Sequence, residues 1–256
     1  MTIYPHERRA KILKKLACRG RIEINKDSKT LGVSKSTLHR DLEELEKQGL
    51  VRKVTGGAIL SESIPFNTHF DLRMQSRAEE KEEIAEKAVV MIRDDTSIFL
   101  DHSTTTVFLA RAIKRHQFKN LVILTNSLAI PFELEGKKGI QVISTGGIVE
   151  TEFKALSGDW VIESRRRLNL HQLFFSVGAI SPEMGLMTQM PFIQSVFPEL
   201  YQAGGEIFIL ADSSKFSKIA TFQLAPLGPE FTIISDHELP GEIRTAIENT
   251  GARVTV

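Results

Sequence analysis

The chain has 256 residues, of which 41% are hydrophobic and 25% charged, an ordinary balance for a globular protein that is long enough for one large domain or for a small domain joined to a medium one. It has no run of about 18 apolar residues, and its first twenty residues lack the apolar block of a signal peptide, so we expect no transmembrane helix and a cytoplasmic location. The single cysteine, Cys18, excludes an intrachain disulfide and a cysteine-rich metal site.

Charge is unevenly distributed along the chain. Residues 1–60 carry 14 Lys and Arg against 7 Asp and Glu, a net charge of +7, whereas the remaining residues carry 19 against 25, a net charge of −6. A basic front on an acidic body suggests two domains with different partners, and the basic one is a nucleic-acid candidate. Chance clustering of solvated lysines is the alternative, which charge alone does not reject.

Two helices are predicted first. One runs from about Pro5, a good first-turn residue, to Ala17. A short second helix covers roughly residues 26–31, and Gly32 is placed to stop it.

A third helix begins after Ser34, which caps it, and extends to about Gln48. Its leucines follow the i, i+4, i+7 rule and predict a buried stripe made of Leu38, Leu42 and Leu45. After Gly49, the β-prone segments "LVRKV" and "AIL" flank the turn "TGG" and predict a small hairpin. Helix, turn, helix and basic hairpin is the order of a winged helix-turn-helix.

The charge pattern of the third helix points to DNA. Its basic residues lie in the first half and its acidic residues in the second, the reverse of what the helix dipole prefers by about 0.3–1 kcal/mol per exposed charge. Docking the start of the helix against a phosphate-lined major groove explains this order, whereas a solvated helix with an ordinary Glu43–Lys47 pair is the alternative. The side chains that we expect to face DNA are Ser34, Lys35, Ser36, Thr37, His39 and Arg40. The wing that we expect to contact the DNA backbone contains Arg52, Lys53, Thr55 and Gly56.

The segment "VSKSTLHRDLEELEKQGLVRKVTGGA", residues 33–58, resembles the winged helix-turn-helix of the DeoR family of bacterial sugar-metabolism regulators, whose usual pattern is VS-x-x-TIRRDL, L-x-x-x-G-x-[LI]-x-R and x-HGGA. His39 replaces the first arginine of the usual pair, and Thr55 replaces the wing histidine. Asp27 and Ser28 occupy the place of a normally buried Leu-Ala, so an apolar anchor is missing from the second helix. The resemblance implies an operator-binding domain over residues 1–60.

The rest of the chain reads as a linker and an α/β domain. Residues 61–78 mix polar and aromatic residues without a clear period, and a helix is expected from Glu79. Apolar runs then end at Asp101, Asn126, Gly147, Ala179, Lys215 and Asp236. Predicted helices lie at 105–116, 159–167, 191–203 and 240–249. Short apolar strands that alternate with helices predict a mostly parallel sheet covered on both faces, here over residues 79–256.

Polar residues follow these apolar runs, where the carboxyl ends of the strands should meet and where open α/β sheets bind ligands. In "DHSTTT" a strand end leads through hydroxyl groups into a helix start, which favours an anion. Ser103, Thr104 and Thr105 would then complete a phosphate cradle to which Lys215 adds a positive charge. Helix capping and a solvated lysine are the alternative.

The family resemblance covers essentially the whole chain, because "LDHSTTT", "TNS", "TGG" and "DSSKF" match the sensor motifs LD-x-GTT, TNS, GG and D-x-SKF. That sensor looks like the ribose-5-phosphate isomerase fold with its catalytic function lost, and it binds phosphorylated sugars. The resemblance implies an effector site lined by Asp101, Thr104, Thr105, Asn126, Gly147, Asp212 and Lys215. The strand-end pattern adds Ser103, Gly146 and Gly178. Ser103 replaces a family glycine and is expected to narrow the loop or distort its turn.

Two other classes compete. A sugar-phosphate isomerase that carries a DNA-binding domain would use Asp101, Glu183, Asp212 and Lys215 as acids and base, although "SVGAISPE" replaces the acid-rich turn that this enzyme needs. A DNA-binding architectural protein without a ligand is the third class. Nucleotide-binding glycine motifs and metal-spaced histidines are absent from the sequence, so we expect no cofactor and no metal, and His102 is expected to face solvent.

The sequence thus predicts a ligand-responsive transcription regulator, a repressor rather than an enzyme. Its expected partners are double-stranded operator DNA and a phosphorylated sugar that lowers operator affinity, with reciprocal coupling between the two. Because helix-turn-helix readers usually act on repeated half-sites, a homodimer or homotetramer is expected.

Overall fold

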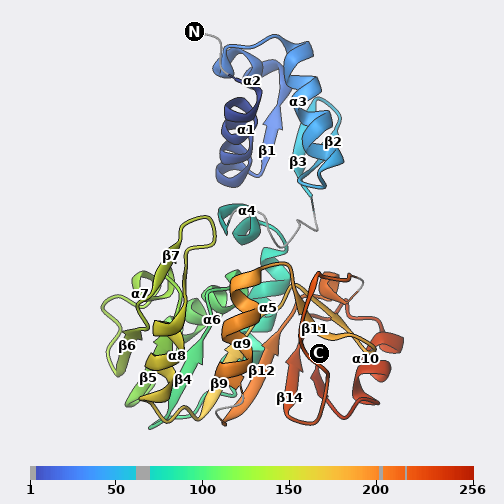
Figure 1. Cartoon of the computed structure of the whole chain (residues 1–256). Coiled ribbons are helices and arrows are strands. Elements are labelled where there is room, and N and C mark those ends of the chain that lie inside the picture. Colours follow the sequence, from blue (N-terminus) through green and yellow to red (C-terminus); the bar gives the residue numbers. More distant parts are fainter. Residues whose placement is uncertain (1–3, 62–69, 202–203, 217) are drawn as a thin grey trace. The chain divides into compact units, whose positions relative to one another are not determined.

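The computed structural model describes residues 4–61, 70–201, 204–216 and 218–256. Contacts divide the chain into two units, Met1–Ala78 and Glu79–Val256, and each is described by itself (Figure 1). Residues 62–69 of the predicted linker and residues 202–203, at the end of the helix predicted over 191–203, lie outside the described residues. Within the described ranges, no helix is both long enough and apolar enough to cross a membrane.

The first unit combines helices with a small antiparallel sheet of order β1-β3-β2. Its elements are α1 (Pro5–Arg19), β1 (Arg21–Glu23), α2 (Ile24–Leu31), α3 (Lys35–Lys47), β2 (Val51–Val54), β3 (Gly57–Leu60) and α4 (Phe70–Gln75). The three predicted helices and the hairpin are confirmed to within about two residues. Strand β1 was not predicted, because three residues with one apolar member are too short to show alternation.

The core of the first unit forms on the predicted leucine stripe. Leu38 and Leu42 are fully buried and Leu45 is 1% exposed, and they pack with apolar residues of α1, β1 and β3. Each buried leucine contributes about 1.5–3 kcal/mol relative to an exposed one. Helix α4 lies inside the segment that we predicted as a linker, and its Phe70 is buried at 3% exposure. Part of the predicted linker therefore folds and packs.

The missing apolar anchor of α2 is replaced by a buried ion pair. Asp27 and Ser28 are each only 3% exposed. The Asp27 carboxylate accepts hydrogen bonds from Lys15 Nζ at 2.6 Å and from the backbone N–H of Glu23 at 2.8 Å. Burial alone would raise the pKa of Asp27, but these two bonds and the nearby charges of Lys15 and Arg19 outweigh it and lower the pKa. The carboxylate thus ties α2 to α1 where the family has apolar contacts.

The second unit is built on a seven-stranded sheet of order β15-β14-β12-β9-β4-β5-β6, in which every neighbouring pair is parallel. Its strands are β4 (Ser97–Leu100), β5 (Leu121–Thr125), β6 (Ile140–Ser144), β9 (Gln172–Phe175), β12 (Glu206–Leu210), β14 (Phe231–Ile234) and β15 (Arg253–Thr255). The mostly parallel sheet is confirmed, and only β15 was not predicted. Strands β4 to β6 run outward to one edge and β9 to β15 to the other, so the winding reverses between β4 and β9.

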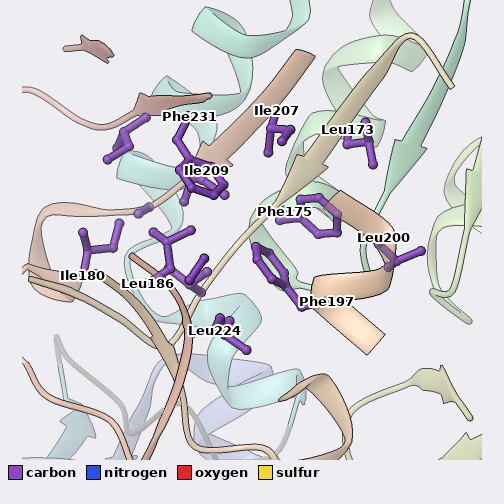
Figure 2. Close-up of a cluster of buried hydrophobic side chains, with 14 of the residues drawn as sticks. Leu173, Phe175, Ile180, Leu186, Phe197, Leu200, Ile207, Ile209, Leu224 and Phe231 are labelled. Atoms are coloured by element: carbon purple, nitrogen blue, oxygen red, sulfur yellow. The ribbon is translucent and has the colours of Figure 1, made fainter. Parts of the chain in front are cut away.

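Helices pack against this sheet and fill the turns between its strands. They are α5 (Ala78–Val89), α6 (Thr104–Arg115), α7 (Ile130–Glu133), α8 (Asp159–Arg166), α9 (Pro191–Tyr201), the 3₁₀ turn η1 (Ser213–Lys215) and α10 (Gly241–Glu248). Figure 2 shows one side of the core, where Phe175 of β9 meets Phe197 of α9, and Ile209 of β12 belongs to the same cluster. Helix α9 is therefore held over β9, one of the two strands at the winding reversal.

Two smaller antiparallel sheets complete the second unit. One has the order β10-β11-β13, from β10 (Ala179–Ser181), β11 (Gly185–Thr188) and β13 (Phe222–Ala225), and the other is the hairpin of β7 (Ile148–Glu150) and β8 (Ala155–Ser157). The run "LFFSVGA", predicted as one strand, divides into β9 and β10. The division has a local cause: the N–H of Ser176 bonds to the carboxylate of Asp101 at 2.9 Å, and Gly178 turns to bond to Met187.

Candidate functional site

The start of α3 presents a polar, positively charged surface. Ser34 caps the helix, because its Oγ accepts the N–H of Thr37 at 3.0 Å. Lys35, His39 and Arg40 are exposed, whereas Leu38 and Leu42 on the other side of the helix are buried in the core. The predicted DNA-facing side chains therefore lie together on the exposed side of α3, with Ser36 exposed and Thr37 half-buried.

The predicted wing is fixed to the helices by its backbone. The carbonyl of Gly56 accepts the N–H of Ile24 at 2.9 Å, and Gly57 admits no side chain, because a Cβ there would lie 1.8 Å from the Ile22 carbonyl oxygen. Lys53 donates its N–H to Glu46 at 2.8 Å and its Nζ to Glu43 at 3.2 Å. The exposed members of this wing are Arg52, Lys53, Thr55 and Gly56.

Helix α3, the wing and the start of α2 enclose a surface hollow of about 270 Å³. Of the predicted DNA-binding residues, this hollow is lined by Lys35, His39, Lys53 and Gly56, and the other six lie outside its lining. Asn25, exposed at the start of α2, also lines the hollow and was not predicted. Asn25 lies beside the hollow because its neighbour Ile24 bonds to Gly56 of the wing, a contact between distant parts of the chain that the sequence does not reveal.

An ion pair sets the position of α3 on α1. Arg8 Nη2 donates to Asp41 Oδ1 at 2.9 Å, and Arg8 Nε donates to the second carboxylate oxygen. The hydrogen bond with Asp41 raises the pKa of Arg8 above its ordinary value. Asp41 thus faces inward and holds α3 against α1, while its neighbour Arg40 faces solvent.

In the second unit the winding reversal lies at Asp101. This carboxylate follows β4, and its Oδ1 accepts the N–H of Ser103 and the hydroxyl of Thr106, both at 2.9 Å. Its Oδ2 accepts the N–H of Ser176, which follows β9, at 2.9 Å. Asp101 is buried at 5% exposure and bridges the two strands at the point where open α/β sheets bind ligands. Both oxygens are used by the fold itself.

Helix α6 begins beside this bridge. The Oγ of Ser103 accepts the N–H of Thr106 at 3.2 Å, and Ser103 has an extended backbone with φ −68°. The prediction that Ser103 narrows the loop or distorts its turn is therefore wrong, because its side chain bonds to the backbone of α6 and caps that helix. Thr104 and Thr105 are 4% and 2% exposed, and neither their hydroxyls nor their backbone N–H groups bond to any residue that the structure describes. Four donors thus remain available at this helix start.

A pocket lies at the same edge, between the strand ends and α9. Its polar lining consists of Asp101, His102, Asn126 and Ser176, and its apolar lining of Phe99, Leu156, Phe175, Phe192, Ile193, Val196, Phe197 and Leu200. The space that a water molecule's centre can reach is only about 20 Å³, which is room for about one water. Side chains of α9 therefore occupy most of the pocket.

Two polar side chains of this pocket stand out. Asn126 is 5% exposed, and its Nδ2 donates to the Leu156 carbonyl at 3.0 Å, while its Oδ1 has no partner among the described residues. A buried acceptor without a donor costs about 1–3 kcal/mol, so Oδ1 can gain from a ligand's hydroxyl. His102 is 3% exposed, with its ring 5.7 Å from that of Phe192. The expectation that His102 faces solvent is wrong.

The other predicted effector residues lie along the same sheet edge but do not line the pocket. Asp212 accepts the N–H of Ser214 at 3.2 Å and begins η1, in which Lys215 is 9% exposed. Strand β12 lies two strands from β4, which is about 10 Å at the usual spacing. Gly147 has φ +125°, and a Cβ there would lie 2.4 Å from the Ser157 carbonyl oxygen, so this glycine serves close packing. The other predicted members outside the pocket lining are Gly146, Gly178 and the three residues at the start of α6, Ser103, Thr104 and Thr105.

One acid of the isomerase alternative, Glu183, follows a strand of a different sheet from the strand that Asp101 follows. Glu183 is exposed in the turn between β10 and β11, where its Oε2 accepts the Ser181 hydroxyl at 2.6 Å. This hydrogen bond lowers the pKa of Glu183, which therefore stays ionised. No group of three His, Cys, Asp or Glu side chains within the described ranges is placed to hold a metal ion.

Two family models match the chain. The one described as a DeoR-like helix-turn-helix domain matches residues 8–64, and the one described as the DeoR C terminal sensor domain matches residues 76–237. The HTH-type transcriptional regulator GolR of Listeria innocua is 30% identical over 256 residues, which cover 99% of each chain. The putative aga operon transcriptional repressor of Escherichia coli O157:H7 is 27% identical over 97% of this chain and 92% of its own.

Solved structures with a similar arrangement are more distant. Ribose 5-phosphate isomerase A from Methanocaldococcus jannaschii matches with a TM-score of 0.41 and 13% identity over 55% of each chain. The translation initiation factor eIF-2B of Pyrococcus horikoshii OT3 matches with a TM-score of 0.46 and 15% identity, over 82% of this chain and 80% of that one.

Proposed function

The chain belongs to the DeoR family of DNA-binding transcriptional regulators, and we propose that it is a repressor of sugar-metabolism genes that leaves its operator when a phosphorylated sugar binds. Relatives that carry the name repressor support the direction of regulation, and a relative named L-fucose operon activator supports the connection to sugars. The observation that carries the proposal is that one chain contains both kinds of surface. The first unit has the exposed basic residues Lys35, His39 and Arg40 on α3, and the second unit has the available donors of Thr104 and Thr105 at the start of α6.

The DNA-binding step follows from the exposed side of α3. We propose that its first half enters the major groove, so that His39 and Arg40 reach base edges while Lys35 contacts phosphate. Lys53, now held by Glu43 at 3.2 Å, would exchange this exposed pair for a DNA phosphate. The logarithm of the affinity falls with the logarithm of the salt concentration, and each phosphate contact makes this slope steeper by about 0.9. We therefore expect a marked salt dependence.

The effector step follows from the start of α6. The free N–H and hydroxyl groups of Thr104 and Thr105 suit a phosphate, which a helix N-terminus also favours. The free Oδ1 of Asn126 suits a sugar hydroxyl. Because the pocket now has room for about one water, a sugar phosphate needs Phe192 and its neighbours on α9 to move. We propose that this displacement of α9 is how effector binding begins to change the protein.

A DNA-release assay with the full chain tests the proposal. The protein first selects its own site from a random pool of double-stranded DNA, and fluorescence anisotropy then measures affinity for that site with and without a panel of sugar phosphates and the parent sugars. We expect one phosphorylated compound to weaken DNA binding at least about tenfold, the effect of roughly 1.4 kcal/mol of coupling. No selected site, or release by none of the compounds, would contradict the proposal.

A matched pair of variants assigns the response to the α6 cradle. The double variant Thr104→Val and Thr105→Val removes two hydroxyls with little change of shape, and it should lose most of the release response while binding DNA as before. Thr151→Val, at an exposed turn between β7 and β8, is the control and should respond like the parent protein. Equal responses of both variants would place the phosphate elsewhere.

A further inference from the structure

An apolar patch is exposed on the second unit where β7 meets α8. Ile148 and Trp160 are 66% and 71% exposed, and we call them the β7–α8 patch. Val149 is also exposed but follows Ile148 in the strand, so its side chain points to the opposite face. Ile148 lies against Gly158, directly before α8, and the Trp160 ring lies over Gly146, two residues before β7, so one local framework holds the patch. Large apolar side chains that are exposed together mark an interaction surface, whereas scattered single ones do not.

The charges along α8 indicate what covers the patch. Asp159 begins the helix and Arg167 directly follows it, and both are exposed. Neither forms an ion pair with any residue in the part of the chain that the structure describes. Trp160 and Arg167 are seven positions apart, so they share a helix face at a separation of roughly 10 Å. Asp159 and Trp160 lie at the start of α8 and Arg167 at its end. In a second α8 that runs antiparallel to the first, each Arg167 would therefore lie opposite the Asp159 and Trp160 of the other helix.

We infer that the β7–α8 patch is a two-fold interface between two copies of this chain, with the α8 helices antiparallel. In this arrangement the Arg167 guanidinium of each copy lies over Trp160 of the second copy and pairs with its Asp159, and each contact occurs twice. An unrelated partner would not require this self-complementary order of charges. The inference rests on the proposed function in one respect: a helix-turn-helix that reads repeated half-sites needs two chains.

Charge reversal tests the geometry on the full chain. Arg167→Glu alone places two acids together at both contacts, and Asp159→Lys alone places two bases together at both. We expect each variant to raise the dissociation constant for self-association at least about tenfold in sedimentation velocity. An equal mixture of the two variants should associate like the parent protein, because both contacts of the mixed dimer are then attractive. Lys114→Glu, an exposed cation in the last turn of α6, is the control and should change nothing.

The single tryptophan reports the same event independently, since it is Trp160. Its emission should shift to shorter wavelength, and acrylamide should quench it less, as the protein concentration rises through the dissociation constant. Failure of the variants to weaken association, or of the mixture to restore it, would overturn this interface. A parent protein that stays monomeric would also overturn it, while selection of a DNA site and its release by a sugar phosphate would still be measured separately and decide the proposed function.

Discussion

Replacing Asp101 by asparagine tests whether this carboxylate serves the fold or a ligand. Its two oxygens accept two different backbone N–H groups, those of Ser103 and Ser176, together with the Thr106 hydroxyl. Asparagine keeps one acceptor oxygen, so one of the two buried N–H groups loses its partner, at a cost of about 1–3 kcal/mol. The surviving bond also loses the contribution of the charge. We therefore expect Asp101→Asn to lower the free energy of unfolding of the second unit by about 2–4 kcal/mol.

Denaturant unfolding followed by Trp160 fluorescence measures this cost, because the only tryptophan lies in the second unit. The midpoint should fall while the slope stays unchanged, since the same surface is exposed on unfolding. Glu152→Gln, which removes one negative charge from an exposed turn, is the control and should stay within about 0.5 kcal/mol of the parent protein. A loss below about 0.5 kcal/mol for Asp101→Asn would refute the structural role and return Asp101 to the list of ligand contacts.

Three further predictions concern the recognition helix, the strand edge and an exposed ion pair. Arg40→Ala should weaken operator binding at least about tenfold at matched salt in the anisotropy assay, and an unchanged affinity would argue against the docking of α3. Lys215→Ala should reduce release by the effector and leave operator affinity intact; an unchanged response would remove Lys215 from the site. The hydrogen bond and charge of Glu83 raise the pKa of His237, so the pair stabilises the fold below about pH 6.5 and loses this contribution as the pH rises through the raised value. His237→Gln should therefore lower the thermal midpoint at about pH 6 and hardly at about pH 9, and equal effects at both values would contradict the assignment.

Much of the fold was predictable because its signals are local. Apolar runs such as "SIFL" and "LVILT" are long enough to show strands buried on both faces, and Ser34 and Gly32 mark helix boundaries by their own capping chemistry. The three-residue strands β1 and β15 contain too few residues for a pattern. Their existence depends on a partner strand far along the chain, β3 for β1 and β14 for β15.

The candidate site was predictable only in part, because side-chain use depends on tertiary neighbours. Asp101 and Asn126 were found from their places after strands, and both line the pocket. Nothing near His102 in the sequence indicates Phe192, whose ring covers it from a helix 90 residues further on. Asp27 shows the same limit, since its partner Lys15 belongs to another helix and turns an apparent loss of packing into a buried ion pair.

Two of the acids that the isomerase alternative would use, Asp101 and Glu183, are not placed to act as a general base. A general base has to reach the substrate with a free acceptor, whereas Asp101 has both oxygens bonded to the fold and Glu183 faces solvent on a different sheet. The other polar groups at the α6 start and in the pocket include the N–H and hydroxyl groups of Thr104 and Thr105, the Asn126 Oδ1, which has no partner among the described residues, and the His102 imidazole. The donors of Thr104 and Thr105 suit a phosphorylated ligand, which supports the sensor that we propose. Turnover of ribose 5-phosphate by the full chain, lost in Asp101→Asn at a temperature where that variant stays folded, would reverse this conclusion.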